Sequence, residues 1–196
     1  MWAQALEVLF PPQCGACGEI GSGFCALCAA QSAPLERRQG ALLVRGLGAY
    51  TGALRSAILA LKDGRRDVAR ALGECLSARL PAGAVLVPVP TTAARLRARG
   101  FDGVVEMARA AASLCGGRAS EVLRQSAGDA QRGRSRAARL CARGRFLCDR
   151  RFDGERLLLV DDVCTTGATL ADCAEALREA GATVQEALVV AIAQSS

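Results

Sequence analysis

The sequence contains no histidine, and its only lysine is Lys62. Without an imidazole, the chain offers no histidine base and no histidine ligand for a metal ion. Aromatic residues make up 4% of the chain, so stacking platforms for nucleic-acid bases are few. No uninterrupted apolar run reaches about eighteen residues, which predicts that no segment spans a membrane.

The remaining composition favours one folded domain with a small appendage. The 196 residues are 51% hydrophobic, enough for a sizeable core and against global disorder. The first residues, MWAQALEVLFPPQ, lack a basic leader and carry Glu7, so we interpret them as a short helix rather than a signal peptide. This predicts a cytoplasmic protein whose ten cysteines are reduced.

Two segments differ in pattern, and we predict a boundary between residues 40 and 41. Residues 1–40 are expected to hold an N-terminal helix and a cysteine-rich element, and APLERRQG (33–40) is interpreted as a polar connection. In residues 41–196, helical periodicity alternates with short apolar runs. That alternation predicts an α/β domain with a mainly parallel sheet flanked by helices. The expected helices cover 50–64, 68–80, 101–114 and 168–181, and the expected strands cover 84–90, 156–162 and 183–193.

The cysteine-rich element carries two CxxC pairs separated by seven residues. Four thiolates so spaced can surround one tetrahedral zinc ion, and a structural site of this kind leaves no open position for catalysis. An element this small has little core of its own, so bound metal would supply much of its stability. Two disulfides, a CxxC redox pair and a four-iron cluster are the alternatives. The candidate metal ligands are Cys14, Cys17, Cys25 and Cys28.

The stretch LLLVDDVCTTGATL, residues 157–170, ends an apolar strand on Asp161 and Asp162 and continues into a helix. In open parallel sheets, ligands bind beyond the carboxyl ends of the strands. The loop 164–169 offers hydroxyls, a glycine and a helix start, which together suit a phosphate. The two carboxylates suit sugar hydroxyls or a cation, so the motif predicts a ribose 5-phosphate site. The structural alternative is a threonine-rich turn in which the aspartates cap a neighbouring helix.

This stretch resembles the phosphoribosyl pyrophosphate (PRPP) signature of type I phosphoribosyltransferases. Together with LFPPQCGAC, ALKDGRR and VPVPTTAARLRARGFD, in that order, it is similar to the ComF family of competence-associated bacterial proteins. The resemblance implies a four-cysteine zinc element followed by a phosphoribosyltransferase-type domain, and a link to DNA uptake in natural transformation. Magnesium would accompany PRPP.

The resemblance also implies roles for single residues. Asp161 and Asp162, the candidate catalytic residues, would contact the ribose hydroxyls, and the following loop would hold the 5-phosphate. Lys62 and the Arg99–Gly100 pair would lie near the pyrophosphate. Cys164 lies in the ligand loop near a helix start, where a thiol pKa tends to fall, although inert packing is the alternative. The predicted PRPP-binding residues are Lys62, Arg99, Gly100, Asp161, Asp162, Cys164, Thr165, Thr166, Gly167, Ala168 and Thr169.

Three positions depart from the family pattern. Asp102 stands where an asparagine is usual, Asp63 where an aromatic residue is usual, and Cys141 near another common asparagine. An added negative charge that faced the pyrophosphate would disfavour binding. The departures leave the phosphate loop unchanged and concern the acceptor side of the pocket.

Residues 124–146 carry seven arginines and one acid. They are interpreted as a loop that closes over the pocket, as a single-stranded-DNA-binding segment, or as a solvated basic face; Phe146 and Phe152 are the nearby aromatics. Three functions follow for the whole chain. The first is a PRPP-binding phosphoribosyltransferase-like protein of DNA uptake. The second is a non-catalytic PRPP or nucleotide sensor, and the third is an adaptor for single-stranded DNA or for proteins of the uptake machinery.

Overall fold

The computed structural model describes residues 11–126 and 145–194. Six strands form one sheet in the order β1-β2-β8-β7-β3-β4, in which only the β1–β2 pair is antiparallel. These strands are β1 (Leu35–Gln39), β2 (Leu42–Ala49), β3 (Val85–Pro88), β4 (Arg118–Ala119), β7 (Arg156–Cys164) and β8 (Thr183–Ile192). A separate antiparallel ribbon pairs β5 (Leu123–Gln125) with β6 (Phe146–Cys148).

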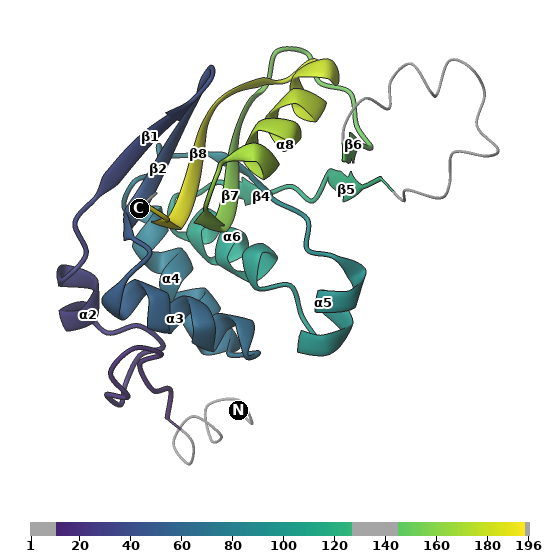
Figure 1. Ribbon diagram of the computed structural model, residues 1–196. Coiled ribbons are helices and arrows are strands. Elements are labelled where there is room, and N and C mark those ends of the chain that lie inside the picture. The colour runs from purple at the N-terminus through teal and green to yellow at the C-terminus, as the bar shows by residue number, and fades with distance from the viewer. Residues whose placement is uncertain (1–10, 127–144, 195–196) are drawn as a thin grey trace.

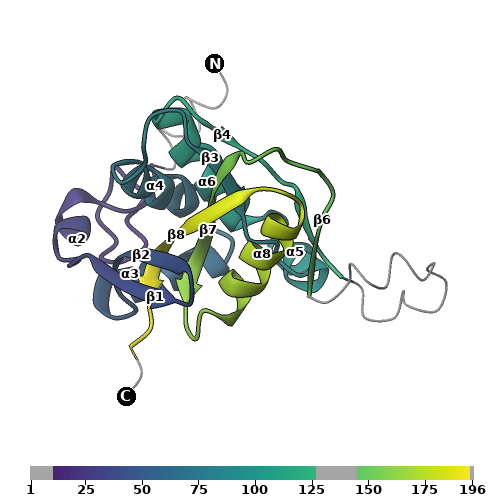
Figure 2. The ribbon, with the colours of Figure 1, turned by 90° about the horizontal axis from the view of Figure 1, so that it is seen from above.

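The helices cover both faces of the sheet. Helices α3 (Gly52–Lys62), α4 (Arg66–Ser77) and α6 (Gly103–Leu114) lie on one face, and α8 (Ala168–Glu179) lies on the other (Figure 1). Figure 2 shows the same two layers from above. Two short helices, α2 (Ala26–Ala30) and α5 (Ala93–Arg99), lie outside these layers. The predicted α/β class with a mainly parallel sheet flanked by helices is confirmed.

The two layers have separate cores because side chains alternate along the strands. In β3, Leu86 joins the core beneath α3, α4 and α6, whereas Val85 and Val87 join the core beneath α8. In β8, Leu188 and Val189 divide in the same way. Each central strand is therefore buried on both faces, which is why its sequence is a nearly continuous apolar run.

Most of the expected elements are confirmed, with differences at their ends. The buried faces of the helices follow their apolar periodicity: Leu54, Ile58 and Leu61 of α3 are buried, as are Leu170, Ala174 and Leu177 of α8. The polar connection at 33–40 is wrong, because residues 35–39 form β1. The boundary placed between residues 40 and 41 lies in the turn that joins β1 to β2.

Two further observations bear on the earlier expectations. No helix within the described ranges is long and apolar enough to cross a membrane. Most of the arginine-rich stretch and Cys141 lie in 127–144, outside the described residues.

Candidate functional site

The candidate site lies where β7 extends beyond its neighbour β3. Strand β3 ends at Pro88, which lies opposite Val160 of β7. Strand β7 continues through Asp161 and Asp162 to Cys164, paired on its other side with β8. The sequence predicted that the strand ends at the two aspartates. In the structure they lie inside β7, which continues for two more residues. On the β3 side, no strand of the described residues pairs with them, and they lie at the carboxyl end of the sheet.

The two carboxylates are held by the backbone of their own strand. Asp161 Oδ1 accepts from the Asp162 N–H at 2.8 Å, and Asp162 Oδ1 accepts from the Val163 N–H at 2.7 Å. Burial raises the pKa of Asp161 well above its ordinary value, and the negative charge of Asp162 raises it further. A negative charge on Asp161 is therefore held at a cost in free energy.

Lys62 supplies the positive charge beside this pair. It is the last residue of α3, and its Nζ lies 3.4 Å from Asp162 Oδ2. The two side chains are 35% and 17% exposed, so the pair is accessible from solvent without being fully hydrated. The structure thus brings together the only lysine of the chain and one of the two predicted ribose-binding carboxylates.

The predicted phosphate loop connects β7 to α8. Thr165 and Thr166 are exposed, and Gly167 is the N-cap residue of α8 with φ +80°. Gly167 has no side chain to cap this helix, and the Ala168 N–H donates to Thr166 Oγ1 at 3.4 Å. The remaining N–H groups of the first turn have no partner within the helix and are available as donors. Such a helix start, with the positive end of the helix dipole, can bind an oxyanion.

Two arginines that sequence analysis did not single out contact this loop. Arg37 of β1 donates to the carbonyl oxygen of Thr165 at 2.5 Å and also to the carbonyl oxygen of Ala193. Arg145 pairs with Asp172 at 2.9 Å and lies 3.4 Å from Thr169 Oγ1. Both contacts join segments far apart in sequence, so no local pattern in the chain indicates them.

The lowered thiol pKa that was one expectation for Cys164 is not found. Cys164 is the last residue of β7 and is 1% exposed, and the helix begins only at Ala168. Burial raises the pKa of the Cys164 thiol, and the neighbouring positive charge of Arg37 does not offset the loss of hydration. The residue belongs to the core beneath α8, which favours the packing alternative.

Arg99 and Gly100 lie at the end of α5. Gly100 takes φ +72° and closes the helix, and its carbonyl oxygen accepts from Arg66 at 3.4 Å. Among the ion pairs of the described residues, none joins Arg99 to Asp161 or Asp162. The structure therefore brings the Arg99–Gly100 segment beside the turn that follows Lys62, and does not bring the Arg99 guanidinium onto the carboxylates.

Asp102, at the position where the resemblance predicts asparagine, has a local structural role. Its Oδ1 accepts from the N–H groups of Val104 at 3.0 Å and Val105 at 3.3 Å, so the side chain is the N-cap of α6. The carboxylate is directed to its own helix start, which favours a negative charge there.

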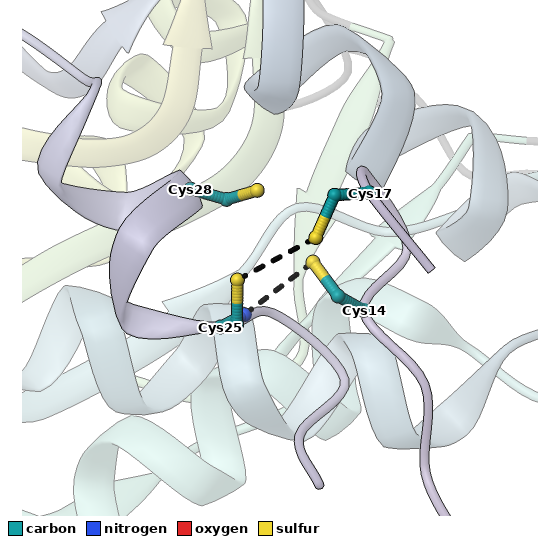
Figure 3. A group of neighbouring side chains, drawn as sticks. All are labelled: Cys14, Cys17, Cys25 and Cys28. Carbon is teal, nitrogen blue, oxygen red and sulfur yellow. Dashed lines mark hydrogen bonds between the residues drawn. The ribbon is translucent and has the colours of Figure 1, made fainter. Parts of the chain in front are cut away.

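The four cysteines of the two CxxC pairs form a second site, remote in sequence from the first. Their Sγ atoms all lie within 4.8 Å of one another, and Cys17 and Cys25 are 3.7 Å apart (Figure 3). All four thiols are free, so the two-disulfide alternative is not what the structure shows. This cluster has the donor set to hold a metal ion such as zinc.

The thiols of the cluster differ in proton affinity. Burial disfavours a thiolate at Cys14, but hydrogen bonds from the backbone of Cys17, Cys25 and Ala16 outweigh it and lower the pKa to about 6. Burial and the neighbouring sulfur atoms raise the pKa of Cys28. A cation among the four sulfurs would favour the thiolate at each of them.

Comparison with known proteins gives a partial likeness. No protein-family model matches the chain. A 38-residue segment is 53% identical to the orotate phosphoribosyltransferase of Halobacterium salinarum, covering 19% of this chain and 22% of that protein. A solved structure described as the allosteric regulatory enzyme of purine biosynthesis matches with a TM-score of 0.42 and 25% identity. That match covers 64% of this chain and 26% of the other, so the chain matches only about a quarter or less of either protein's length.

Proposed function

We propose that this chain binds PRPP with Mg²⁺ at the carboxyl end of β7 and acts as a phosphoribosyltransferase-type protein. The observation that carries the proposal is the placement of Lys62 against Asp162, directly before a glycine-containing loop that opens α8. Positive charge, carboxylates and helix-start donors thus lie along one short segment. The 38-residue similarity to a phosphoribosyltransferase supports the same assignment.

The ligand's groups match the charges of the site. Asp161 and Asp162 would accept hydrogen bonds from the two ribose hydroxyls, and the loop from Thr165 to Thr169 would bind the 5-phosphate. Lys62 would neutralise the pyrophosphate, with the Arg99–Gly100 segment on the far side of the same turn. Bound Mg²⁺ would supply further positive charge to the pyrophosphate oxygens.

In the corresponding reaction, a nucleophile forms a bond to C1 of the ribose while the C1–O bond to pyrophosphate breaks. The bonding pair leaves with pyrophosphate, and a positive charge develops on the sugar. The chain's contribution is to position the ribose through Asp161 and Asp162 and to stabilise the leaving group through Lys62. Release of pyrophosphate with a candidate acceptor separates this enzyme from a PRPP sensor that only binds.

The test is calorimetric titration of PRPP with Mg²⁺ into the wild type and into the double variant Asp161→Asn/Asp162→Asn. Losing hydrogen bonds to charged groups costs about 1.5–3 kcal/mol each, so affinity should fall at least about tenfold. Asp153→Asn, at an exposed position before β7, is the control and should bind as the wild type does. No heat of binding in the wild type would refute the proposal.

We further propose that the four-cysteine cluster holds one structural zinc ion. With Zn–S bonds of about 2.3 Å, neighbouring sulfurs of a tetrahedral site lie about 3.8 Å apart, close to the 3.7 Å between Cys17 and Cys25. The free thiols also favour a reducing compartment such as the cytoplasm. Metal analysis of the wild type should give one zinc per chain. Cys17→Ser should lose it and Cys148→Ser should retain it, whereas less than about half an equivalent in the wild type counts against zinc.

One observation favours a second function, binding of single-stranded DNA, which the ComF resemblance links to DNA uptake. Helix α5 buries none of its residues and carries Arg95, Arg97 and Arg99. If these arginines contact phosphates, log K should fall with log salt at a slope of about −0.7 per contact, and Arg95→Ala/Arg97→Ala should flatten that slope. A slope near zero in the wild type would exclude this function.

A further inference from the structure

The turn between α3 and α4 is closed onto the last turn of α3. The N–H of Asp63 donates to Leu59 O at 2.9 Å, and the N–H of Arg65 donates to Ala60 O at 3.2 Å. These two hydrogen bonds restrict the backbone of the turn that joins Lys62 to Arg65, three residues later. A displacement of Arg65 would be transmitted to Lys62.

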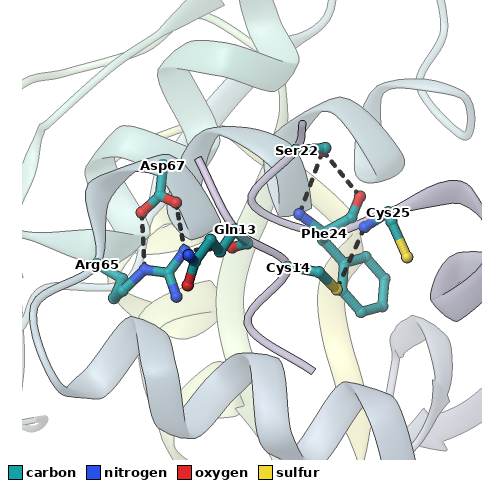
Figure 4. Close-up of polar contacts among 7 residues, drawn as sticks. All are labelled: Gln13, Cys14, Ser22, Phe24, Cys25, Arg65 and Asp67. Atoms are coloured by element: carbon teal, nitrogen blue, oxygen red, sulfur yellow. Dashed lines mark hydrogen bonds and ion pairs between the residues drawn. The ribbon is translucent and has the colours of Figure 1, made fainter. Parts of the chain in front are cut away.

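Arg65 joins this turn to the four-cysteine element (Figure 4). Its guanidinium donates to the carbonyl oxygen of Gln13, the residue before Cys14. The same guanidinium donates two parallel hydrogen bonds to the Asp67 carboxylate, from Nε to Oδ1 at 3.0 Å and from Nη2 to Oδ2 at 2.5 Å. The bidentate pair fixes the orientation of the fork, so one arginine nitrogen is held toward the cysteine element.

Close packing reinforces this contact. A Cβ built on Gly23 would lie 2.3 Å from the carbonyl oxygen of Asp67, and one built on Gly15 would lie 3.0 Å from a methyl of Val68. Cys14, Phe24 and Cys28 are buried in the same core as α3 and α4. The cysteine element is thus packed directly against the start of α4 rather than tethered to it.

The opposite side of the turn contacts the end of α5. Arg66 donates to Gly100 O at 3.4 Å, and its guanidinium lies 4.9 Å from the centre of the Phe101 ring. The segment 62–66 therefore contacts Asp162 through Lys62, the cysteine element through Arg65 and the Arg99–Gly100 segment through Arg66. These are the three parts that the proposed function assigns to ribose, metal and pyrophosphate.

We propose that Arg65 is a positioning residue through which the metal-loaded cysteine element holds Lys62 at the ligand site. Loss of metal loosens the two CxxC turns, because the element has too little core to keep its shape alone. Gln13 O then no longer fixes Arg65, the turn gains freedom, and Lys62 spends less time at Asp162. Metal occupancy thereby sets PRPP affinity; this consequence rests on the proposed function.

The experiment combines amide hydrogen exchange of residues 59–66 with PRPP titration. It compares the wild type, the chelator-treated wild type, Arg65→Ala and Arg65→Lys, with Arg70→Ala as the control. Arg70 lies in the next turn of α4 with a side chain 62% exposed. Arg65→Ala and metal removal should each speed exchange in 59–66 and weaken PRPP binding about tenfold. Arg65→Lys should recover part of the affinity, and Arg70→Ala should match the wild type.

Metal removal from Arg65→Ala should add little further loss of affinity, since both changes break the same link. Unchanged affinity in a metal-retaining Arg65→Ala variant would overturn the inference, as would faster exchange confined to residues 11–30 after metal removal. Absence of PRPP binding in the wild type would instead refute the proposed function, and the exchange comparison alone would then decide whether Arg65 transmits the state of the cysteine element.

Discussion

Lys62 Nζ and Asp162 Oδ2 lie 3.4 Å apart, joining the end of α3 to the carboxyl end of β7. Asp161 and Asp162 are adjacent carboxylates, and the raised pKa of Asp161 reflects burial and the charge next to it. One lysine thus lies beside two adjacent acids, and this excess of carboxylates suits the Mg²⁺ ion that would accompany the ligand.

Lys62→Gln should weaken binding of PRPP with Mg²⁺ by about tenfold or more, because a charged partner of the pyrophosphate is lost. Its melting temperature should also fall slightly, since the acidic pair loses its counter-charge. The control is Arg55→Gln, which removes an exposed positive charge from the same helix. Equal loss of affinity in both variants would mean that only net charge matters.

The polar residues of this site could be selected from sequence, but several of their contacts could not. The apolar run 157–160 and the spacing within 168–181 depend on burial, which periodicity reports directly. The contacts of Arg37 with the loop depend on which strands are neighbours in the sheet, and no local pattern records that. Strand β1 escaped detection because an edge strand is covered only in part, which leaves charged residues along it. Likewise β7 passes beyond Asp162 because β8 continues beside it.

Asp161→Asn should stabilise the unliganded protein at neutral pH while weakening PRPP binding about tenfold. Because the pKa of Asp161 is raised in the folded state, the Asp161 carboxyl group stays protonated to a higher pH in the folded protein than in the unfolded chain. Stability therefore falls as pH rises from the ordinary aspartate value of 3.8 through the raised folded value, and the penalty persists above it.

Urea unfolding at neutral and acidic pH measures this effect. The advantage of Asp161→Asn over the wild type should shrink as the pH falls toward the ordinary aspartate range, where both chains are neutral at this position. Asp153→Asn, at an exposed position, should show no such pH-dependent gain. A destabilised Asp161→Asn at neutral pH would show that the carboxylate has favourable partners that outweigh burial.

Asp102→Asn should leave PRPP affinity unchanged, because the Asp102 carboxylate caps α6 and is engaged by its N–H groups. Asparagine caps a helix nearly as well, so the free energy of unfolding should change by less than about 0.5 kcal/mol. Asp102→Ala should lose about 1 kcal/mol by removing the cap. A gain in PRPP affinity of more than about threefold in Asp102→Asn would show instead that the charge opposes the pyrophosphate.

Gly167→Ala should impair the phosphate loop more than its effect on stability alone explains. Gly167 takes φ +80°, and an added Cβ would lie 2.9 Å from the Gln39 side chain of β1. The left-handed backbone costs alanine about 1–2 kcal/mol, and moving Gln39 or the loop would displace the donors at the start of α8. Gly154→Ala is the matched control, since Gly154 has φ +73° and open space around its Cβ position.

Both variants should lower the free energy of unfolding by a similar amount in urea titrations, but only Gly167→Ala should lose affinity for PRPP and for ribose 5-phosphate. Equal losses of affinity for both ligands would locate the defect at the 5-phosphate, because both ligands carry this group and the loop is proposed to bind it. If Gly154→Ala weakened binding equally, the effect would come from general destabilisation, and the assignment of the loop to the 5-phosphate would fall.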